Sequence, residues 1–311
     1  MENAPFFDDI AQGPDAGAAH WVTTSDGLRI RVGHWTGQHV KGTVLLFPGR
    51  TEYIEKYGPA AADFLARGFA TVVIDWRGQG LADRTSNIQA MGDVVAFGDY
   101  QHDVTAAVAH ARALGLPEPF YLCAHSMGGC IGLRALHNAL PVKAAMFSAP
   151  MWGITMAPVT RPFAWALSSV ARTIGADQRF APGQGAVGYV DREPFAGNAL
   201  TTDLAMYEFM QMQLAARPEL SLGGPSLRWL NEALREMRRL SRMQSPLTPC
   251  CTFLGTQEAI VDPARIRNRM ARWTDGVLHI LDGAQHEVMM EIPTMRRDVF
   301  DLTAAHFDRH A

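Results

Sequence analysis

The chain has 311 residues, 48% of them hydrophobic and 19% charged, which is ordinary for a globular protein. At about 150 residues per domain, this length corresponds to about two domains and is enough to bury a large core. The 28 Lys and Arg residues against 31 Asp and Glu residues leave a formal net charge of -3. A strong overall field that would attract nucleic acid or another polyanion is therefore excluded.

Cysteine usage and the N-terminal residues indicate a protein that stays inside the cell. The spacing of Cys123, Cys130, Cys250 and Cys251 matches neither a disulfide framework nor a paired metal site, so we expect buried, reduced thiols. Residues 1–19 carry four carboxylates but no basic segment and no apolar segment of a secretory signal. We therefore expect a cytoplasmic location and no transmembrane segment.

The first predicted element is a β-hairpin over residues 21–35, turning at Asp26-Gly27. In its second strand, the apolar residues Leu28, Ile30 and Val32 alternate with Arg29, Arg31 and Gly33. This alternation predicts that one face of the strand is buried and the other exposed.

Short, almost wholly apolar runs follow and alternate with helical segments. The runs 44–47, 70–74, 120–124 and 144–148 suit strands that are covered on both faces, as in a parallel sheet. The helical segments between them end at Gly68 and Gly115, which are placed as C-terminal caps. This order predicts an α/β fold with a mostly parallel central sheet and helices on both faces.

The alternation stops near Pro150 and resumes near Pro249. The residues between them lack clear strands and contain aromatic and Met-rich helical stretches, one of them starting behind Asp203. Strand-like runs return at 250–255 and 277–281, and residues 293–310 form a predicted final helix. We interpret residues 1–150 and 246–311 as one core, with 151–245 as a helical cap inserted into it.

The sharpest local signal is Ser126, which stands between the apolar run 120–124 and a helix of small residues. A serine on such a strand-to-helix turn has a strained backbone, and Ala124 and Gly128 are small enough to let neighbouring chain come close. The turn exposes the hydroxyl, and we predict that Ser126 is a nucleophile. The Met127 amide at the start of the helix is the first candidate donor to an oxyanion.

A serine nucleophile needs a base, which we expect on the loop after a late strand. His286 follows the run 277–281 and occupies that position, whereas His125 is expected to be structural. Two carboxylates follow the preceding strand. We choose Glu258 as the acid that orients His286; Asp262, our second choice, directly precedes Pro263 and is well placed to cap a helix.

The second oxyanion donor is expected after the first parallel strand, where Pro48-Gly49-Arg50 forms a turn. The Arg50 backbone amide is the candidate, and an ion pair of its side chain with Glu52 is compatible with that role. Asp75 to Gly80 is expected to be a tight structural turn, because it lacks the ending of a phosphate-binding loop. Gly183 to Gly188 spells a dinucleotide fingerprint but follows no strand, so we predict no cofactor there.

Three segments together resemble the branch of the α/β-hydrolase fold that contains monoacylglycerol lipases and bacterial lysophospholipases. They are Ala124 to Gly129, Asp75 to Gly80 and Gly283 to Glu287. The loop 48–52, followed by Lys56-Tyr57, looks more like the bacterial lysophospholipase form. In that branch Glu can replace the usual Asp acid, which supports Glu258. Ala124 stands where the family normally has Gly, and the elbow keeps a small side chain.

The resemblance implies a serine hydrolase that cleaves carboxylic esters of lipid-like, amphiphilic substrates through an acyl-enzyme. We expect a lysophospholipase or monoacylglycerol lipase that needs no cofactor and no metal, with peripheral contact to the inner face of the membrane through the cap. The alternatives within the same fold are a small-ester carboxylesterase and a proline-type aminopeptidase. A binding protein that has lost its chemistry is disfavoured, because all three triad positions carry competent residues. Chain composition does not predict an oligomeric state.

Overall fold

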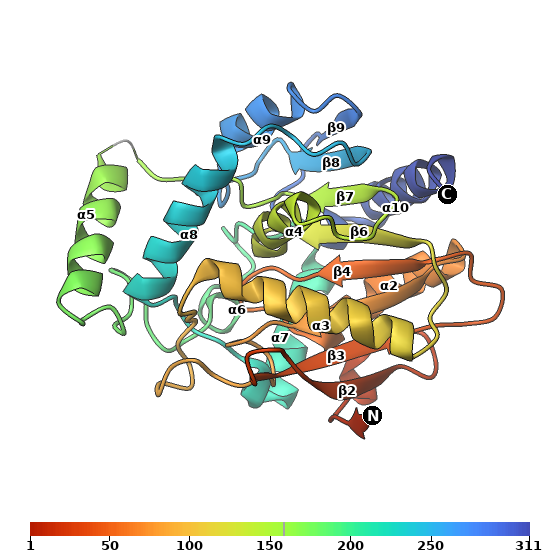
Figure 1. The fold of residues 1–311 in the computed structure, drawn as a ribbon, viewed down its shortest axis with the longest axis horizontal. Helices are drawn as coiled ribbons and strands as arrows, with labels where there is room; N and C mark the ends of the chain where they lie inside the picture. Colours follow the sequence, from red (N-terminus) through yellow and green to blue (C-terminus); the bar gives the residue numbers. More distant parts are fainter. Residues whose placement is uncertain (158) are drawn as a thin grey trace.

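The computed structural model describes residues 1–157 and 159–311 and is built around a nine-stranded sheet (Figure 1). The strand order is β1-β2-β3-β5-β4-β6-β7-β8-β9. Pairing is antiparallel from β1 to β5 and parallel from β5 to β9. The strands are β1 Glu2–Asn3, β2 Ala18–Thr23, β3 Arg29–Trp35, β4 Thr43–Phe47, β5 Ala70–Asp75, β6 Phe120–His125, β7 Ala145–Ser148, β8 Cys250–Gly255 and β9 Gly276–Leu281.

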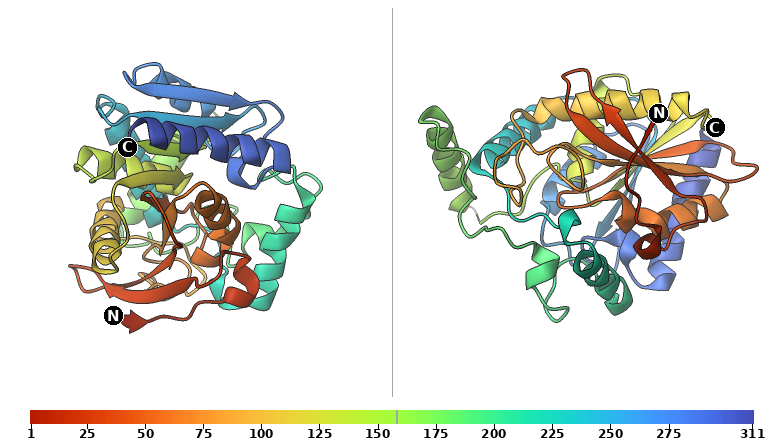
Figure 2. Two further views of the ribbon diagram at one scale, coloured as in Figure 1. Left: turned by 90° about the vertical axis from the view of Figure 1, so that its right-hand side faces the viewer. Right: turned by 90° about the horizontal axis from the view of Figure 1, so that it is seen from below.

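Helices cover both faces of the sheet. The α-helices are α1 Asp8–Ala11, α2 Gly58–Ala66, α3 Tyr100–Ala113, α4 Met127–His137, α5 Thr160–Thr173, α6 Tyr189–Arg192, α7 Leu204–Ala216, α8 Leu227–Ser241, α9 Pro263–Met270 and α10 Pro293–Arg309. The 3-10 helices are η1 Ile54–Tyr57, η2 Phe97–Asp99, η3 Pro218–Leu220 and η4 Val288–Met290. One core cluster packs α3, α4 and α9 against the sheet, and a second packs α2 and α10 on the opposite face (Figures 1 and 2).

The predicted α/β fold is confirmed, and the physical reason is burial. Every residue of β4, β5, β6, β7 and β8 is buried, as expected for strands covered on both sides. Gly68 and Gly115 follow α2 and α3 with φ of 84° and 69°, a left-handed conformation that suits glycine. The four cysteines are free and buried, as predicted.

The predicted hairpin is present as β2 and β3, but the expectation of one exposed face on β3 is wrong at Arg31. The Arg31 side chain is fully buried, with its guanidinium 2.7 Å from Asp75 Oδ2 and 2.8 Å from Glu55 Oε2. A buried arginine is tolerated when carboxylates compensate its charge and accept its hydrogen bonds. Because η1 and β5 supply those carboxylates, alternation within β3 alone could not reveal them.

The segment predicted as the cap, 151–245, contains α5 to α8 and their connecting loops, apart from residue 158, which lies outside the described residues. Helix α8 packs against α4 and η2, and α5 packs against α8. Helix α7 starts behind Asp203, whose side chain accepts a hydrogen bond from Met206 N, and packs near α1. Figure 1 and the right-hand view of Figure 2 place α5 at the outer edge of the molecule.

Over the described residues, we find no helix that is both long and apolar enough to span a membrane.

Candidate active site

Ser126 lies between the end of β6 and the start of α4, with φ 48° and ψ −116°. This conformation is sterically unfavourable for a residue with a side chain. It is held from both sides, because Ser126 N donates to Ser148 O at 3.0 Å and Met151 N donates to Ser126 O at 2.8 Å. The strained strand-turn-helix geometry predicted for Ser126 is therefore present.

Gly128 explains how closely the turn approaches the neighbouring strand. A Cβ added at Gly128 would lie 2.0 Å from Phe47 O and 2.6 Å from Pro48 O, which no other residue type can accommodate without moving backbone. The first turn of α4 is thus packed directly against the end of β4. The Met127 amide and the loop that carries Arg50 consequently lie at the same edge of the sheet.

His286 and Glu258 are joined by a hydrogen bond of 2.7 Å between His286 Nδ1 and Glu258 Oε2. The other oxygen of Glu258 accepts from Ile260 N at 2.6 Å and Val261 N at 3.0 Å. Burial would raise the pKa of Glu258, but His286 and the two amides outweigh it and lower this pKa. The carboxylate is therefore suited to hold the proton on Nδ1, which leaves Nε2 of His286 free to act as a base.

Asp262, the second-choice acid, has a different role. Its side chain accepts from Ala264 N at 3.1 Å and Arg265 N at 3.3 Å, which caps α9. It also lies 3.2 Å from Arg161 Nη2 on the cap side. Of the two carboxylates after β8, it is Glu258 that the fold brings to His286.

The His286 ring lies beside the nucleophile turn, with its centroid 4.8 Å from that of His125, the residue before Ser126. Ser126 is only 8% exposed and His286 only 3%. Within the described residues, Ser126 Oγ makes no hydrogen bond to His286; in enzymes without substrate, such catalytic hydrogen bonds are often long and tighten in the complex.

The loop after β4 carries the second candidate oxyanion donor and is braced by the turn Asp75 to Gly80. Gln79 Nε2 donates to Gly49 O at 3.0 Å, and Gln79 Oε1 accepts from Thr51 N at 3.1 Å. Trp76 Nε1 donates to Pro48 O at 2.9 Å. Across the described residues, neither the Arg50 amide nor the Met127 amide donates a hydrogen bond to the chain. Both remain available for an incoming oxyanion.

The Arg50 side chain does not pair with Glu52, so that reading of the sequence is wrong. Arg50 Nη1 donates to Gly223 O at 2.9 Å, and the guanidinium lies over the Trp229 ring at 5.8 Å. Burial lowers the pKa of Arg50 to about 10. The Arg50 side chain thus links the loop after β4 to residues of the segment predicted as the cap, a contact that appears only in the folded chain.

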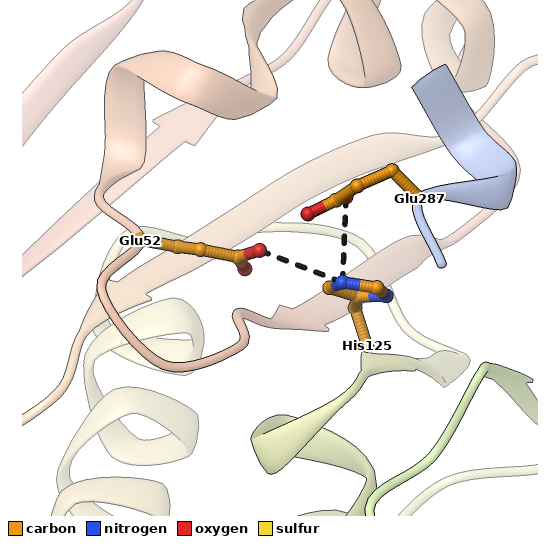
Figure 3. Close-up of side chains that lie close together, drawn as sticks. All are labelled: Glu52, His125 and Glu287. Atoms are coloured by element: carbon orange, nitrogen blue, oxygen red, sulfur yellow. Dashed lines mark ion pairs between the residues drawn. The ribbon is translucent and has the colours of Figure 1, made fainter. Parts of the chain in front are cut away.

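Behind this site, Glu52, His125 and Glu287 form a buried group whose ligand atoms all lie within 4.8 Å of one another (Figure 3). Two carboxylates and an imidazole are donors that a divalent cation accepts. Lys56 Nζ, however, lies 2.6 Å from Glu52 Oε1 and 2.6 Å from Glu287 Oε1. The ammonium already supplies a positive charge to both carboxylates, so this arrangement does not suit a metal ion. Sequence spacing could not indicate the group, since its members come from three separate loops.

Together, a mostly parallel sheet, a strained serine at a strand-to-helix turn and a histidine-carboxylate pair on later loops define an α/β hydrolase. A model of the serine aminopeptidase S33 family matches residues 38–293, and the chain belongs to this family.

Comparison with known proteins agrees with this assignment. The chain is 29% identical to lysophospholipase L2 of Escherichia coli K12, over 93% of this chain and 86% of that protein. Its fold is similar to a soluble variant of monoglyceride lipase from Saccharomyces cerevisiae, with a TM-score of 0.71, 20% identity and coverage of 93% and 94% of the two chains. It is also similar to a thermostable carboxyl esterase from Bacillus coagulans, with a TM-score of 0.74, 14% identity and coverage of 96% and 99%.

Proposed function

We propose that this hydrolase cleaves carboxylic esters of lipid-like substrates, as a lysophospholipase or a monoacylglycerol lipase, through Ser126, His286 and Glu258. The observation that carries the proposal is the strained Ser126 turn beside a His286 that is hydrogen bonded to a buried carboxylate. The lysophospholipase L2 of E. coli, which the chain matches over most of its length, supports the substrate class.

In the proposed mechanism, His286 Nε2 takes the proton from Ser126 Oγ as that oxygen attacks the ester carbonyl. The Met127 and Arg50 amides donate to the oxyanion of the tetrahedral intermediate, and His286 then protonates the leaving alcohol. Water, deprotonated by His286, attacks the acyl-enzyme and releases the fatty acid. Glu258 stays ionised and stabilises the imidazolium that forms in each half-reaction.

The test is the Ser126→Ala variant of the purified protein. Loss of such a nucleophile costs on the order of 10⁶ in turnover, so we expect activity at background. Retention of most of the esterase activity would disprove the mechanism. A comparison of turnover rates separates the lipid substrates from the small-ester and aminopeptidase alternatives, the latter raised by the family description. The substrates compared are lysophosphatidylcholine, monoacylglycerol, p-nitrophenyl esters of increasing chain length and a prolyl amide.

We also propose that the cap contacts the inner face of a membrane, which fits the cytoplasmic location supported by four free, buried thiols. Helix α5 carries exposed apolar residues, with Phe163 62% and Val170 58% exposed. On the neighbouring helix α8 and at its C-terminal end, four exposed arginines form no ion pair among the described residues: Arg235, Arg238, Arg239 and Arg242. Exposed apolar and cationic groups on two helices that pack against each other suit an anionic lipid surface.

Flotation with vesicles tests this contact. We expect binding to phosphatidylcholine vesicles that contain phosphatidylglycerol, and weaker binding at high salt, because exposed charges are screened. Phe163→Ser should lower binding while the turnover of a short, water-soluble ester stays the same. Equal recovery of the variant and the unmodified chain with the vesicles would contradict the proposal.

A further inference from the structure

Four buried, ionisable side chains lie behind the site and come from three separate segments of the chain. Glu52 follows β4, Lys56 belongs to η1, His125 ends β6 and Glu287 precedes η4. All four are at most 6% exposed. Figure 3 shows the carboxylates of Glu52 and Glu287, which lie on different segments of the chain, both pointing at the His125 ring.

Each loop that enters this cluster also carries a group of the proposed machinery. Glu52 accepts a hydrogen bond from Gly49 N, the residue before Arg50. His125 directly precedes Ser126, and Glu287 directly follows His286. A shift of any member of the cluster would therefore move an oxyanion donor, the nucleophile or the base.

The charges in the cluster require a second cation. Lys56 compensates one of the two carboxylates, being 2.6 Å from each. His125 Nε2 lies 3.3 Å from Glu287 Oε2 and 3.5 Å from Glu52 Oε1, while His125 Nδ1 faces Ser148 Oγ at 2.9 Å and Ser148 O at 3.2 Å. Nδ1 can therefore donate to the Ser148 carbonyl. Nε2 is buried without a hydrogen bond among the described residues but lies within ion-pair distance of both carboxylates, and a ring nitrogen in that position favours the protonated imidazolium.

The shift in the pKa of His125, which is upward, agrees with this geometry. Burial alone would lower it, but Glu287 and Glu52 outweigh burial and raise it. The same attraction, from His125 and Lys56, holds the pKa of Glu287 well below its usual range in spite of burial. Two anions and two cations make the cluster neutral.

We propose that Glu52, Lys56, His125 and Glu287 form a neutral positioning cluster that aligns the oxyanion loop, Ser126 and His286 and sets the charge around the His286 ring. This inference rests on the proposed function. The four are positioning residues and have no assigned contact with substrate. The charged groups near His286 are Glu258 at its Nδ1, the His125 ring at a centroid distance of 4.8 Å, and Glu287 as the next residue.

Lys56→Met tests the cluster, because it leaves a net negative charge behind His286. A negative charge favours the protonated base, so the acid limb of the kcat/KM profile should move to higher pH by about half a unit or more. We expect kcat to fall about 10-fold to 100-fold, as for a small misplacement of catalytic groups, with KM within about threefold of the unmodified chain. The double variant Lys56→Met/Glu287→Gln is neutral again and should return the limb towards its original position.

Two exposed residues provide matched controls. Lys41→Met and Glu118→Gln break the surface pairs with Asp308 and Arg112 and should leave kcat and the acid limb unchanged. All rates are divided by the concentration of active sites, titrated with a fluorophosphonate. A purely structural role would lower that concentration and leave the acid limb in place.

The charge of His125 can be observed without turnover. In ¹⁵N spectra of the Ser126→Ala protein at pH 8, we expect both ring nitrogens of His125 to be protonated, and the isosteric Glu287→Gln change to remove one of those protons. This measurement replaces the kinetics if Lys56→Met does not fold. A neutral His125, or an unmoved acid limb in folded Lys56→Met, would overturn the inference. An active Ser126→Ala enzyme would instead overturn the proposed function.

Discussion

Replacement of Glu258 by glutamine is expected to abolish most turnover while leaving the fold intact. The carboxylate accepts three hydrogen bonds, two from the Ile260 and Val261 amides and one from His286 Nδ1. Glutamine has a single acceptor oxygen. The two backbone amides are fixed donors, so that oxygen must remain on their side and the NH₂ group then faces His286.

A donor at that position forces His286 to present a lone pair at Nδ1 and to carry its proton on Nε2. In the proposed mechanism Nε2 takes the proton of Ser126, so a proton on Nε2 would block the base. A wrong tautomer of this kind costs about 10⁴ in kcat, or about 5 kcal/mol of transition-state stabilisation.

The assay is kcat and KM for a p-nitrophenyl ester near pH 8, with active sites titrated. Asp262→Asn is the matched control: asparagine caps a helix about as well as aspartate, so this change at the start of α9 should cost little stability and little turnover. Retention of a tenth or more of kcat in Glu258→Gln, together with loss of activity in Asp262→Asn, would refute the assignment of the acid.

Three further changes probe the nucleophile turn, the oxyanion loop and a histidine cluster. Ser126→Gly should unfold in urea with about 1 kcal/mol more stability than Ser126→Ala, because glycine relieves the strain at φ 48°; equal stabilities would count against strain. Gln79→Leu should lower kcat about 10-fold to 100-fold with little change in KM. The change removes both hydrogen bonds that hold the loop after β4, which carries the proposed oxyanion donor Arg50 N, and such a donor is worth about 3 kcal/mol. An unchanged kcat would show that Gln79 is not needed to position this loop. Burial, with smaller contributions from His20 and His34, lowers the pKa of His110 to about 4. The unfolded chain therefore binds the extra proton first, and stability should fall as the pH drops from about 6.5 towards 4. Urea titrations at pH 7.5 and pH 5 should show that the free energy of unfolding falls less for His110→Leu than for the unmodified chain. Equal falls in the two proteins would contradict this reasoning.

Local patterns were sufficient to predict much of the fold and the strained turn at Ser126. Apolar runs such as 44–47 and 120–124 predict buried strands because a strand covered on both faces has no polar side. The strand-to-helix turn at Ser126 can be predicted because small residues within three positions of it allow the end of β4 to come close. Such features depend on residues that are close together in the chain, so the amino-acid sequence alone is enough to predict them.

The polar surroundings of the site were decided by tertiary structure. Alternation in β3 predicts an exposed Arg31, yet η1 and β5 bring carboxylates that allow its burial. Arg50 contacts Gly223 rather than nearby Glu52, because folding packs the segment around residue 223 against the loop after β4.

The buried cluster shows the same division most clearly. Lys56 and Glu287 are 231 positions apart. They meet because β4 and β6 are neighbouring strands and the loop after β9, which lies beyond β7 and β8 in the sheet, extends back to the ends of both. The amino-acid sequence by itself determined the elements and the serine turn, since these follow from local periodicity and turn chemistry. Which buried charges compensate one another was settled by strand order, because desolvated charges need partners that the linear chain does not place next to them.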